Sequence, residues 1–382
     1  MVNPKSLRYN KIIMKIAFIG QKGIGDLERG GGIEKHVTEL AVRLVKKGHE
    51  VFVYARRRYC PTHPTFRGVN LICLPTVYRK NIETILHTWF STFHALFQDY
   101  DVIHFHGVGP ATLAWLPRLF KPKTRVIVTF HSQDQYHQKW GWLARHYLQF
   151  GEWASVHFPH VCITVSHVLQ VYCRNRFRRQ VVYIPNGAEM TEVHSVEALK
   201  TFGVEPNEYV LFVGRIVPQK GLHFLISAFK QLHTIKKLVI VGAPSFSDRY
   251  MNELKRLAGA DPSIIFTGQL NGEALHELFA QAYLYVQPSE SEGLPVAVLE
   301  AMSYGTAVLV SDIPENLEAI QNTGFSFVNR DIPDLTARLR KLLSETDSVA
   351  AMGKRGKAMV AEHFNWDKIT DKVEEVYVTA RH

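Results

Sequence analysis

Two cations and two carboxylates in the second half of the chain have the types and spacing needed to bind an anion and a set of hydroxyl groups. Arg215 and Lys220 lie five residues apart around Pro218, just after an apolar run. We expect Lys220 at the start of a helix, where a cation opposes the helix dipole and a bound diphosphate would offset the charge. Two cations and nearby backbone donors can neutralise a departing diphosphate.

The two carboxylates, Glu292 and Glu300, are expected in one loop–helix unit. Glu292 precedes a helix that Pro295 opens, and Glu300 lies inside that helix. A carboxylate can accept hydrogen bonds from two neighbouring hydroxyls, which a ribose or a sugar ring presents. Glutamates eight residues apart are common by chance. This pair is more informative because it lies within a longer motif, residues 288–315, that follows a predicted strand. The pair is therefore a candidate for holding a nucleotide ribose and a sugar.

A glycine-rich loop at 21–36 follows the first predicted strand and leads into a helix. Such a junction cradles phosphate with backbone N–H groups and the helix dipole. The spacing does not fit a dinucleotide fingerprint, because Glu28 stands where G-x-G-x-x-G needs its third glycine. Arg56–Arg58 after the second strand leave an NADP-type site open as an alternative. The run Gly30–Gly32 better fits a close approach of backbone to a diphosphate or an acceptor.

Histidines follow two of the predicted strands. His131 comes directly after the buried strand 125–130, at the carboxyl end where sites gather. We expect His104 and His106 to point to opposite faces of strand 101–106, which leaves only His106, nearer the strand end, as a candidate. The pattern Asp99-Tyr100-Asp101 starts that strand and lies at the wrong end for a metal–diphosphate site. With no zinc motif either, no metal is expected to be required.

The elements that must position these residues form two similar α/β units. Apolar runs alternate with helical segments, which predicts parallel sheets covered on both faces. The first unit has strands at 15–20, 50–55, 69–73, 101–106, 125–130, 161–166 and 181–185, and the second at 209–214, 237–242, 263–268, 282–288, 307–311 and 324–328. Helices of the second unit are expected at 220–233, 247–258, 271–281, 294–304 and 331–344. A polar segment, 186–200, joins two doubly wound domains whose cleft is the expected ligand site.

Composition supports two domains with different partners. The chain has 382 residues and a net charge of +10, of which residues 1–200 carry +14 together with five of the six tryptophans. A basic, aromatic-rich half suits phosphates or an acidic membrane surface, while no nucleic-acid module is visible. Four cysteines without C-x-x-C spacing are expected to be reduced thiols, which favours the cytoplasm. No apolar run is long enough to cross a bilayer, and residues 1–13 read as a lead-in before the first strand.

Several motifs together resemble one enzyme family. They are Gly31-Gly32-Ile33-Glu34, HFHG (104–107), TFH (129–131), IPNG (184–187), GRIVPQKG (214–221), EGLPVAVLEAM (292–302) and SDIPEN (311–316). This set is similar to the retaining family 4 glycosyltransferases of GT-B fold, over nearly the whole chain. The resemblance implies an acceptor-binding Rossmann-like domain at 1–188, a donor-binding one at 189–365, and a final helix at about 366–380 that packs back on the first domain.

The resemblance also implies roles for the candidate residues. Arg215 and Lys220 would bind the donor diphosphate, Glu300 the ribose and Glu292 the donor sugar. The donor set is completed by Gly31, Gly32, Gly293 and Leu294. The catalytic set implied for the transfer is His131, Arg215, Lys220 and Glu292.

The implied reaction moves a sugar, with retention, from a nucleotide-diphosphate sugar to an acceptor hydroxyl of a cell-surface glycan or a lipid-linked acceptor, without a cofactor. An NADP-dependent oxidoreductase and a non-catalytic nucleotide-sugar binding protein are the alternatives.

A membrane contact is a further expectation for the basic half. Residues 135–153 place Trp140, Leu143, Tyr147 and Phe150 at helical spacing beside Lys139, Arg145 and His146, and residues 173–180 add four arginines. That composition suits an interfacial helix on the inner face of a membrane. The alternative is a helix that buries the same stripe on its own sheet.

Overall fold

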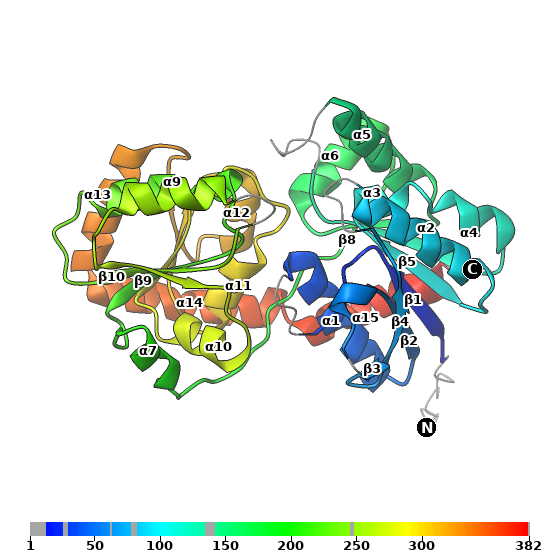
Figure 1. The fold of residues 1–382 in the computed structure, drawn as a ribbon, viewed down its shortest axis with the longest axis horizontal. Coiled ribbons are helices and arrows are strands. Elements are labelled where there is room, and N and C mark those ends of the chain that lie inside the picture. The colour runs from blue at the N-terminus through cyan, green and yellow to red at the C-terminus, as the bar shows by residue number, and fades with distance from the viewer. Residues whose placement is uncertain are drawn as a thin grey trace, which may run out of the picture.

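The chain folds into two α/β units, each built on a parallel sheet. A computed structural model describes residues 13–25, 30–61, 63–77, 82–133, 142–244 and 248–380. Figure 1 shows the two units side by side, with the last helix returning from the second unit to the first. None of the helices in these described ranges is both long enough and apolar enough to cross a membrane.

The first unit contains an eight-stranded sheet with strand order β3-β4-β2-β1-β5-β6-β7-β8. All pairs are parallel except β3 with β4. Its strands are β1 (Lys15–Ile19), β2 (Glu50–Arg56), β3 (Thr65–Phe66), β4 (Val69–Leu74), β5 (Val102–His106), β6 (Arg125–Phe130), β7 (Val161–Thr164) and β8 (Val182–Tyr183). Its helices are α1 (Gly32–Lys46), α2 (Glu83–Leu96), α3 (Val108–Ala111), α4 (Trp115–Phe120), α5 (Trp142–His157) and α6 (His167–Phe177).

The second unit repeats the pattern in a six-stranded parallel sheet with order β11-β10-β9-β12-β13-β14. Its strands are β9 (Tyr209–Val213), β10 (Lys237–Val241), β11 (Ile264–Gly268), β12 (Leu284–Gln287), β13 (Val308–Ser311) and β14 (Phe325–Phe327). Its helices are α7 (Glu197–Thr201), α8 (Leu222–Phe229), α9 (Arg249–Ala258), α10 (Gly272–Ala280), α11 (Val296–Ser303), α12 (Pro314–Ile320), α13 (Ile332–Ser344) and α14 (Thr346–His363). Both sheets therefore have the doubly wound order that the sequence predicts.

Burial explains why the strand runs are apolar throughout. In β1 and β9 the residues after the first are nearly all buried, because helices cover both faces of each sheet. In α1 the apolar side chains of Val37, Leu40, Ala41 and Leu44 pack into the core. On the opposite side of the helix, Glu39 is partly exposed and Lys46 is exposed. Apolar periodicity is thus sufficient to place these elements to within one or two residues.

The chain passes between the two units at two points that lie side by side. The backbone N–H of Ala188 donates to the carbonyl of Phe364 at 2.9 Å. Gly187 lies so close to the Trp366 ring that a Cβ there would stand 2.7 Å from it. From this point α15 (Trp366–Thr379) runs back along α1, and its buried residues join the core of the first unit. The final helix therefore packs on the first unit.

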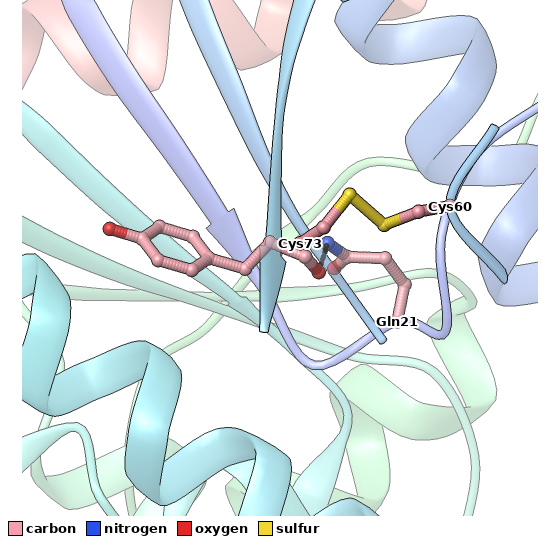
Figure 2. Close-up of a disulfide and its surroundings, with 4 residues drawn as sticks. Gln21, Cys60 and Cys73 are labelled. Atoms are coloured by element: carbon pink, nitrogen blue, oxygen red, sulfur yellow. Dashed lines mark hydrogen bonds between the residues drawn. A yellow bond between two sulfur atoms is a disulfide. The ribbon is translucent and has the colours of Figure 1, made fainter. Parts of the chain in front are cut away.

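The prediction of four reduced cysteines is wrong. Cys60 and Cys73 form a disulfide, with their Cα atoms 6.2 Å apart, whereas Cys162 and Cys173 are buried free thiols. Sequence spacing missed the pair because β4 lies beside β2, which brings the turn after β2 next to the carboxyl end of β4. Figure 2 shows the disulfide beside Gln21, whose side-chain amide donates to the carbonyl of Tyr54 at 3.0 Å. The disulfide therefore sits next to the glycine-rich loop.

We predict that the protein purified in air and denatured without reductant exposes two titratable thiols per chain, and four after reduction. The substitution Cys60→Ser should lower the free energy of unfolding by about 3 kcal/mol, the usual loss for a disulfide that closes a loop of this length. The difference from the wild type should vanish in reducing buffer. Four free thiols in the air-exposed protein would contradict the assignment.

Candidate active site

The candidate site lies where the two units face each other, at the carboxyl ends of their strands. In each sheet the strand order reverses there, between β1 and β5 in the first and between β9 and β12 in the second. The N-terminus of α1 meets the N-terminus of α11: a Cβ on Gly32 would lie 3.7 Å from a methyl carbon of Val296. Figure 1 shows α1 and α11 on the facing sides of the two units. Two helix N-termini directed at one place favour a bound anion.

Lys220 and Glu292 form a direct, largely buried ion pair. The prediction that Lys220 starts a helix is wrong. Lys220 is the last residue of a short 3-10 helix (Pro218–Lys220) that precedes α8. Its Nζ lies 2.6 Å from Oε1 of Glu292, which also accepts a hydrogen bond from the Gln287 amide at 2.7 Å. Burial acts to raise the pKa of Glu292, but the Lys220 ammonium together with hydrogen bonds from Ser289 and Gln287 outweighs it and holds that pKa below its usual value. Glu292 is therefore a carboxylate at neutral pH.

Glu300 lies on α11 and forms an ion pair with Lys35 of α1. Burial acts to lower the pKa of Lys35, and the Glu300 carboxylate outweighs it, so the net shift is upward. This pair joins the two units across the site. It also shows that Glu300 faces the first unit, on the side where α1 begins.

Arg215 is exposed and has no ion-pair partner among the described residues. It lies close enough to Lys22, in the glycine-rich loop of the first unit, to help lower the pKa of that lysine, although burial is the larger cause. The two cations come from different units, and the charge of Arg215 is felt across the site at Lys22. An anionic ligand would balance the positive charge of Arg215.

Gly31 and Gly32 form the start of α1. Gly31 is the N-cap residue, and its N–H donates to Oε2 of Glu34 at 2.8 Å. The carbonyl of Gly31 accepts the first helical hydrogen bond, from Lys35. Both glycines thus lie at the end of α1 that faces α11. Part of the loop before them, 26–29, lies outside the described residues, and so does Glu28.

Gly293 is a point where the backbones of the two units approach closely. A Cβ on Gly293 would lie 1.9 Å from the carbonyl oxygen of His131, a distance that no side chain can accept. The next residue, Leu294, is buried and belongs to the same apolar cluster as Phe130 of β6. The loop that carries Glu292 is therefore held against the end of β6 by backbone contact on one side and by a shared core on the other.

His131 and His106 lie together at the ends of β6 and β5. His131 Nε2 is 3.2 Å from Nδ1 of His106, and both side chains are buried. The prediction that His104 and His106 point to opposite faces is wrong, because residues two apart in a strand share a face. Their ring centroids are 4.2 Å apart. His104 is a structural residue, bonded to the hydroxyls of Tyr377 and Thr129 at 2.7 Å each.

The remaining motif predictions concern Asp101 and Arg56. Asp101 accepts a hydrogen bond from the backbone of Lys15 at 2.8 Å, at the amino end of the sheet, which agrees with its prediction as the polar start of a strand. Arg56 is buried and bonded to Glu83 of α2 at 3.1 Å. That pairing leaves Arg56 poorly suited to bind the 2′-phosphate of NADP.

Several residues at the site were missed by sequence reasoning. Lys35 and His36 lie one turn into α1, where a lysine and a histidine look like ordinary helix residues. Asn186 accepts a hydrogen bond from Nδ1 of His36 at 2.8 Å. Its motif, 184–187, contributes to the family resemblance but gives no role for the side chain. Gln287 ends β12 and orients Glu292. The only signal for Gln287 in the sequence is its position as a polar residue at the end of a buried strand.

Known families and relatives match both units. Residues 30–192 match the family model "Glycosyltransferase Family 4", and residues 199–359 match "Glycosyl transferases group 1". An uncharacterized glycosyltransferase of Methanocaldococcus jannaschii is 28% identical, over 92% of this chain and 95% of that protein.

Solved structures share the two-unit arrangement. A sucrose-phosphate synthase from Thermosynechococcus elongatus has a TM-score of 0.83 at 24% identity and covers 96% of this chain and 98% of its own. Anabaena HepE, solved in complex with UDP-glucose, has a TM-score of 0.78 at 18% identity and covers 96% of this chain and 100% of its own. At these identities the likeness shows that the fold is shared.

We predict that Gly293→Ala forces the loop at 288–294 away from β6, because the new methyl group would meet backbone that cannot move aside. The free energy of unfolding should fall by about 1–3 kcal/mol, as for other overpacked positions. The radius of gyration from small-angle scattering should rise as the units separate.

Gly109→Ala is the matched control, because its Cβ would meet open space. The control should change neither quantity measurably. A Gly293→Ala protein as stable and compact as the wild type would show that the two units do not touch at this point.

Proposed function

We propose that this chain, which belongs to the family 4 glycosyltransferases of GT-B fold, takes its sugar from a nucleotide-diphosphate donor and passes it to an acceptor hydroxyl. The observation that carries the proposal is the group of charges between the facing N-termini of α1 and α11. Arg215, which has no ion-pair partner among the described residues, offers a cation for a diphosphate on the side of the site towards Lys22. The UDP-glucose complex of HepE supports the donor class.

Each charged group has one role in the proposed donor complex. Arg215 and Lys220 bind the two phosphates, and Glu300 accepts hydrogen bonds from the ribose hydroxyls. Glu292 accepts from hydroxyls of the donor sugar, which lies towards His131. The glycines Gly31, Gly32 and Gly293 and the buried Leu294 shape the walls against which the donor lies. Lys35 pairs with the Glu300 carboxylate until the ribose arrives.

The proposed reaction exchanges one bond at the anomeric carbon for another on the same face. The bond from that carbon to the phosphate oxygen breaks, and a bond to the acceptor oxygen forms. The acceptor proton passes to the departing phosphate, so the configuration is retained without a covalent enzyme intermediate. Negative charge grows on the diphosphate in the transition state, where Arg215 and Lys220 stabilise it more than in the ground state. Neither a cofactor nor a metal takes part.

A panel of donors tests the proposed function. Sugars linked to UDP, GDP, ADP and TDP are added to the protein, and the donor that binds the folded state should raise the melting temperature. That donor, with a glycan or lipid-linked acceptor, should give a product whose anomeric configuration by NMR equals that of the donor. Stabilisation by NADP instead of any nucleotide sugar would favour the oxidoreductase. Binding without turnover would favour a non-catalytic binding protein.

We predict that Lys220→Ala lowers turnover by about 100-fold or more, because it removes one preorganised donor to the leaving diphosphate. Initial rates at saturating donor measure the effect. Lys200→Ala is the control, since Lys200 is an exposed lysine of the same unit that pairs with Glu197. Turnover near that of the wild type in Lys220→Ala would remove the diphosphate assignment.

We also propose that the first unit docks on an anionic membrane surface at the cytoplasmic face, where a lipid-linked or cell-surface glycan acceptor would be met. The outer face of α2 and α4, two helices that contact each other, carries large apolar side chains that are two-fifths to three-quarters exposed. They are Trp89, Phe90, Phe93, Phe97, Trp115, Leu119 and Phe120. Together they expose on the order of 700 Å² of apolar side chain, more than a typical monomer leaves in one patch.

Charge on this α2–α4 face suits an acidic surface. Arg118, Lys121 and Lys123 lie on or just after α4, and the nearby acid, Asp99, is bonded to Lys121 at 3.4 Å. Aromatic rings and long cations together are typical of an interfacial membrane contact. The α1–α15 face of the same unit instead carries cross-helix ion pairs, such as Lys47 with Asp371 at 2.6 Å.

The segment first expected to contact the membrane contributes only in part. Phe150 is exposed and stacks on Trp153, at the outer side of α5. Tyr147 turns inward, with its hydroxyl 2.8 Å from that of Thr112. Lys139 and Trp140 lie outside the described residues, as does the side chain of Leu143. The exposed arginines of 173–180 lie at the end of α6.

We predict that the protein co-sediments with vesicles rich in acidic phospholipid, in a salt-sensitive manner, and that Phe93→Ser combined with Phe97→Ser lowers the bound fraction several-fold. The reason is the loss of two apolar side chains, the second of them 73% exposed. Ile235→Ser is the control, because Ile235 is 90% exposed on the other unit. Equal binding by all three proteins, or none by the wild type, would contradict the docking surface.

A further inference from the structure

Three histidines from distant parts of the sequence meet in the interior beside the candidate site. His36 comes from α1, His106 from the end of β5 and His131 from the residue after β6, and all three are buried. Nitrogen atoms of the three rings lie within 4.8 Å of one another. The pair formed by His106 Nδ1 and His131 Nε2 is 3.2 Å apart.

Two nitrogens of this cluster have no hydrogen-bond partner among the described residues. They are the buried Nε2 atoms of His36 and His106. The neighbouring His104 differs, since both of its nitrogens are bonded to hydroxyls. Buried polar atoms normally find a partner, so the unpartnered Nε2 of His36 points to a ligand, while His106 offers its Nδ1 on the side of His131.

The surroundings of His36 prepare it to be a metal ligand. Its Nδ1 lies 2.8 Å from the amide oxygen of Asn186, so Nδ1 carries the hydrogen and the lone pair is on Nε2. Metal-binding histidines commonly donate their other ring N–H to an oxygen in this way. Burial lowers the pKa of His36 to about 4 and the pKa values of His106 and His131 well below the usual range. All three are therefore neutral at pH 7, which is the form that binds metal.

We propose that His36, His106 and His131 bind a divalent transition-metal ion such as Zn²⁺, and that the bound ion inhibits the enzyme. Imidazole ligands suit zinc, cobalt, nickel and copper better than magnesium or calcium. Zinc bound tetrahedrally at 2.0–2.1 Å separates its ligand nitrogens by about 3.3 Å, which the pair His106 and His131 already matches. A small shift of the His36 ring that keeps its hydrogen bond to Asn186 brings in the third ligand, and water completes the shell.

The inhibition half of this inference rests on the proposed function, whereas the binding half does not. The backbone carbonyl of His131 lies against Gly293 in the loop that carries Glu292, so an ion on the His131 ring would be held directly behind the place where the donor sugar is expected. Because the histidines are buried beneath this contact, the ion enters when the two units part. Metal binding would then compete with donor binding, which requires the two units to be closed.

Cobalt titration of the full chain tests the binding half. Co²⁺ should bind at one site per chain with the strong visible absorption of a tetrahedral ion, and Zn²⁺ should displace it. His36→Gln and His106→Gln should each weaken Co²⁺ binding at least tenfold.

His87→Gln is the matched control for these two variants. His87 is likewise buried, with an unpartnered Nε2 and a pKa lowered to about 4, but lies in α2, away from the cluster. It should bind Co²⁺ like the wild type. Absence of the absorption band, or equal loss in the control, would overturn the metal site.

X-ray absorption of the wild-type protein with one equivalent of Zn²⁺ keeps the test independent of how well the variants fold. Three imidazole nitrogens at about 2.0 Å are expected. A spectrum dominated by sulfur or by carboxylate and water oxygens would overturn the assignment, because the cluster offers neither.

Inhibition is measured by adding Zn²⁺ to the transfer assay with the preferred donor. Wild-type transfer should fall at least tenfold at the concentration that fills the site and return on chelation, while His36→Gln should resist. Zn²⁺ that binds without slowing transfer would overturn the inhibition half. If no donor were used at all, the proposed function would fail, yet the cobalt band would still report on the metal site.

Discussion

The contact between Gly293 and the carbonyl of His131 is the constraint on which the whole candidate site depends. It brings a loop of the second sheet within backbone distance of the first, which only a residue without a side chain permits. Everything else follows from that closeness. The N-termini of α1 and α11 meet, Lys35 reaches Glu300, and Arg215 comes near Lys22. A site made by two units in this way is complete only while they are closed, so water is excluded when the units come together.

The charges at the site are arranged so that each buried carboxylate has a cation. Lys220 neutralises Glu292, and Lys35 neutralises Glu300. Breaking either pair would leave a charge buried alone, which is strongly unfavourable. A donor therefore has to replace these partners rather than simply add to them: its phosphates would take over Lys220, and its hydroxyls would share the carboxylates. Arg215 is different because it has no carboxylate to give up among the described residues. This makes it the natural first contact for an incoming diphosphate.

Sequence patterns predicted the architecture well and the contacts across the site poorly. Runs such as 209–213 and 237–241 are apolar on both faces, so their parallel sheet follows from burial alone. The pair Lys220 and Glu292 was predicted as two ligand-binding groups but not as partners of each other. Lys35 gave no signal, because its role depends on a residue 265 positions away. The disulfide was missed for the same reason, since strand adjacency and not spacing brings its cysteines together.

The most direct test is a crystal structure of the chain with the nucleoside diphosphate of its preferred donor. Our account predicts both phosphates between the N-termini of α1 and α11, with the Arg215 guanidinium and the Lys220 ammonium in hydrogen-bond contact with them and the ribose hydroxyls on Glu300. A nucleotide bound away from this interface, or bound there while both cations remain turned from its phosphates, would contradict it.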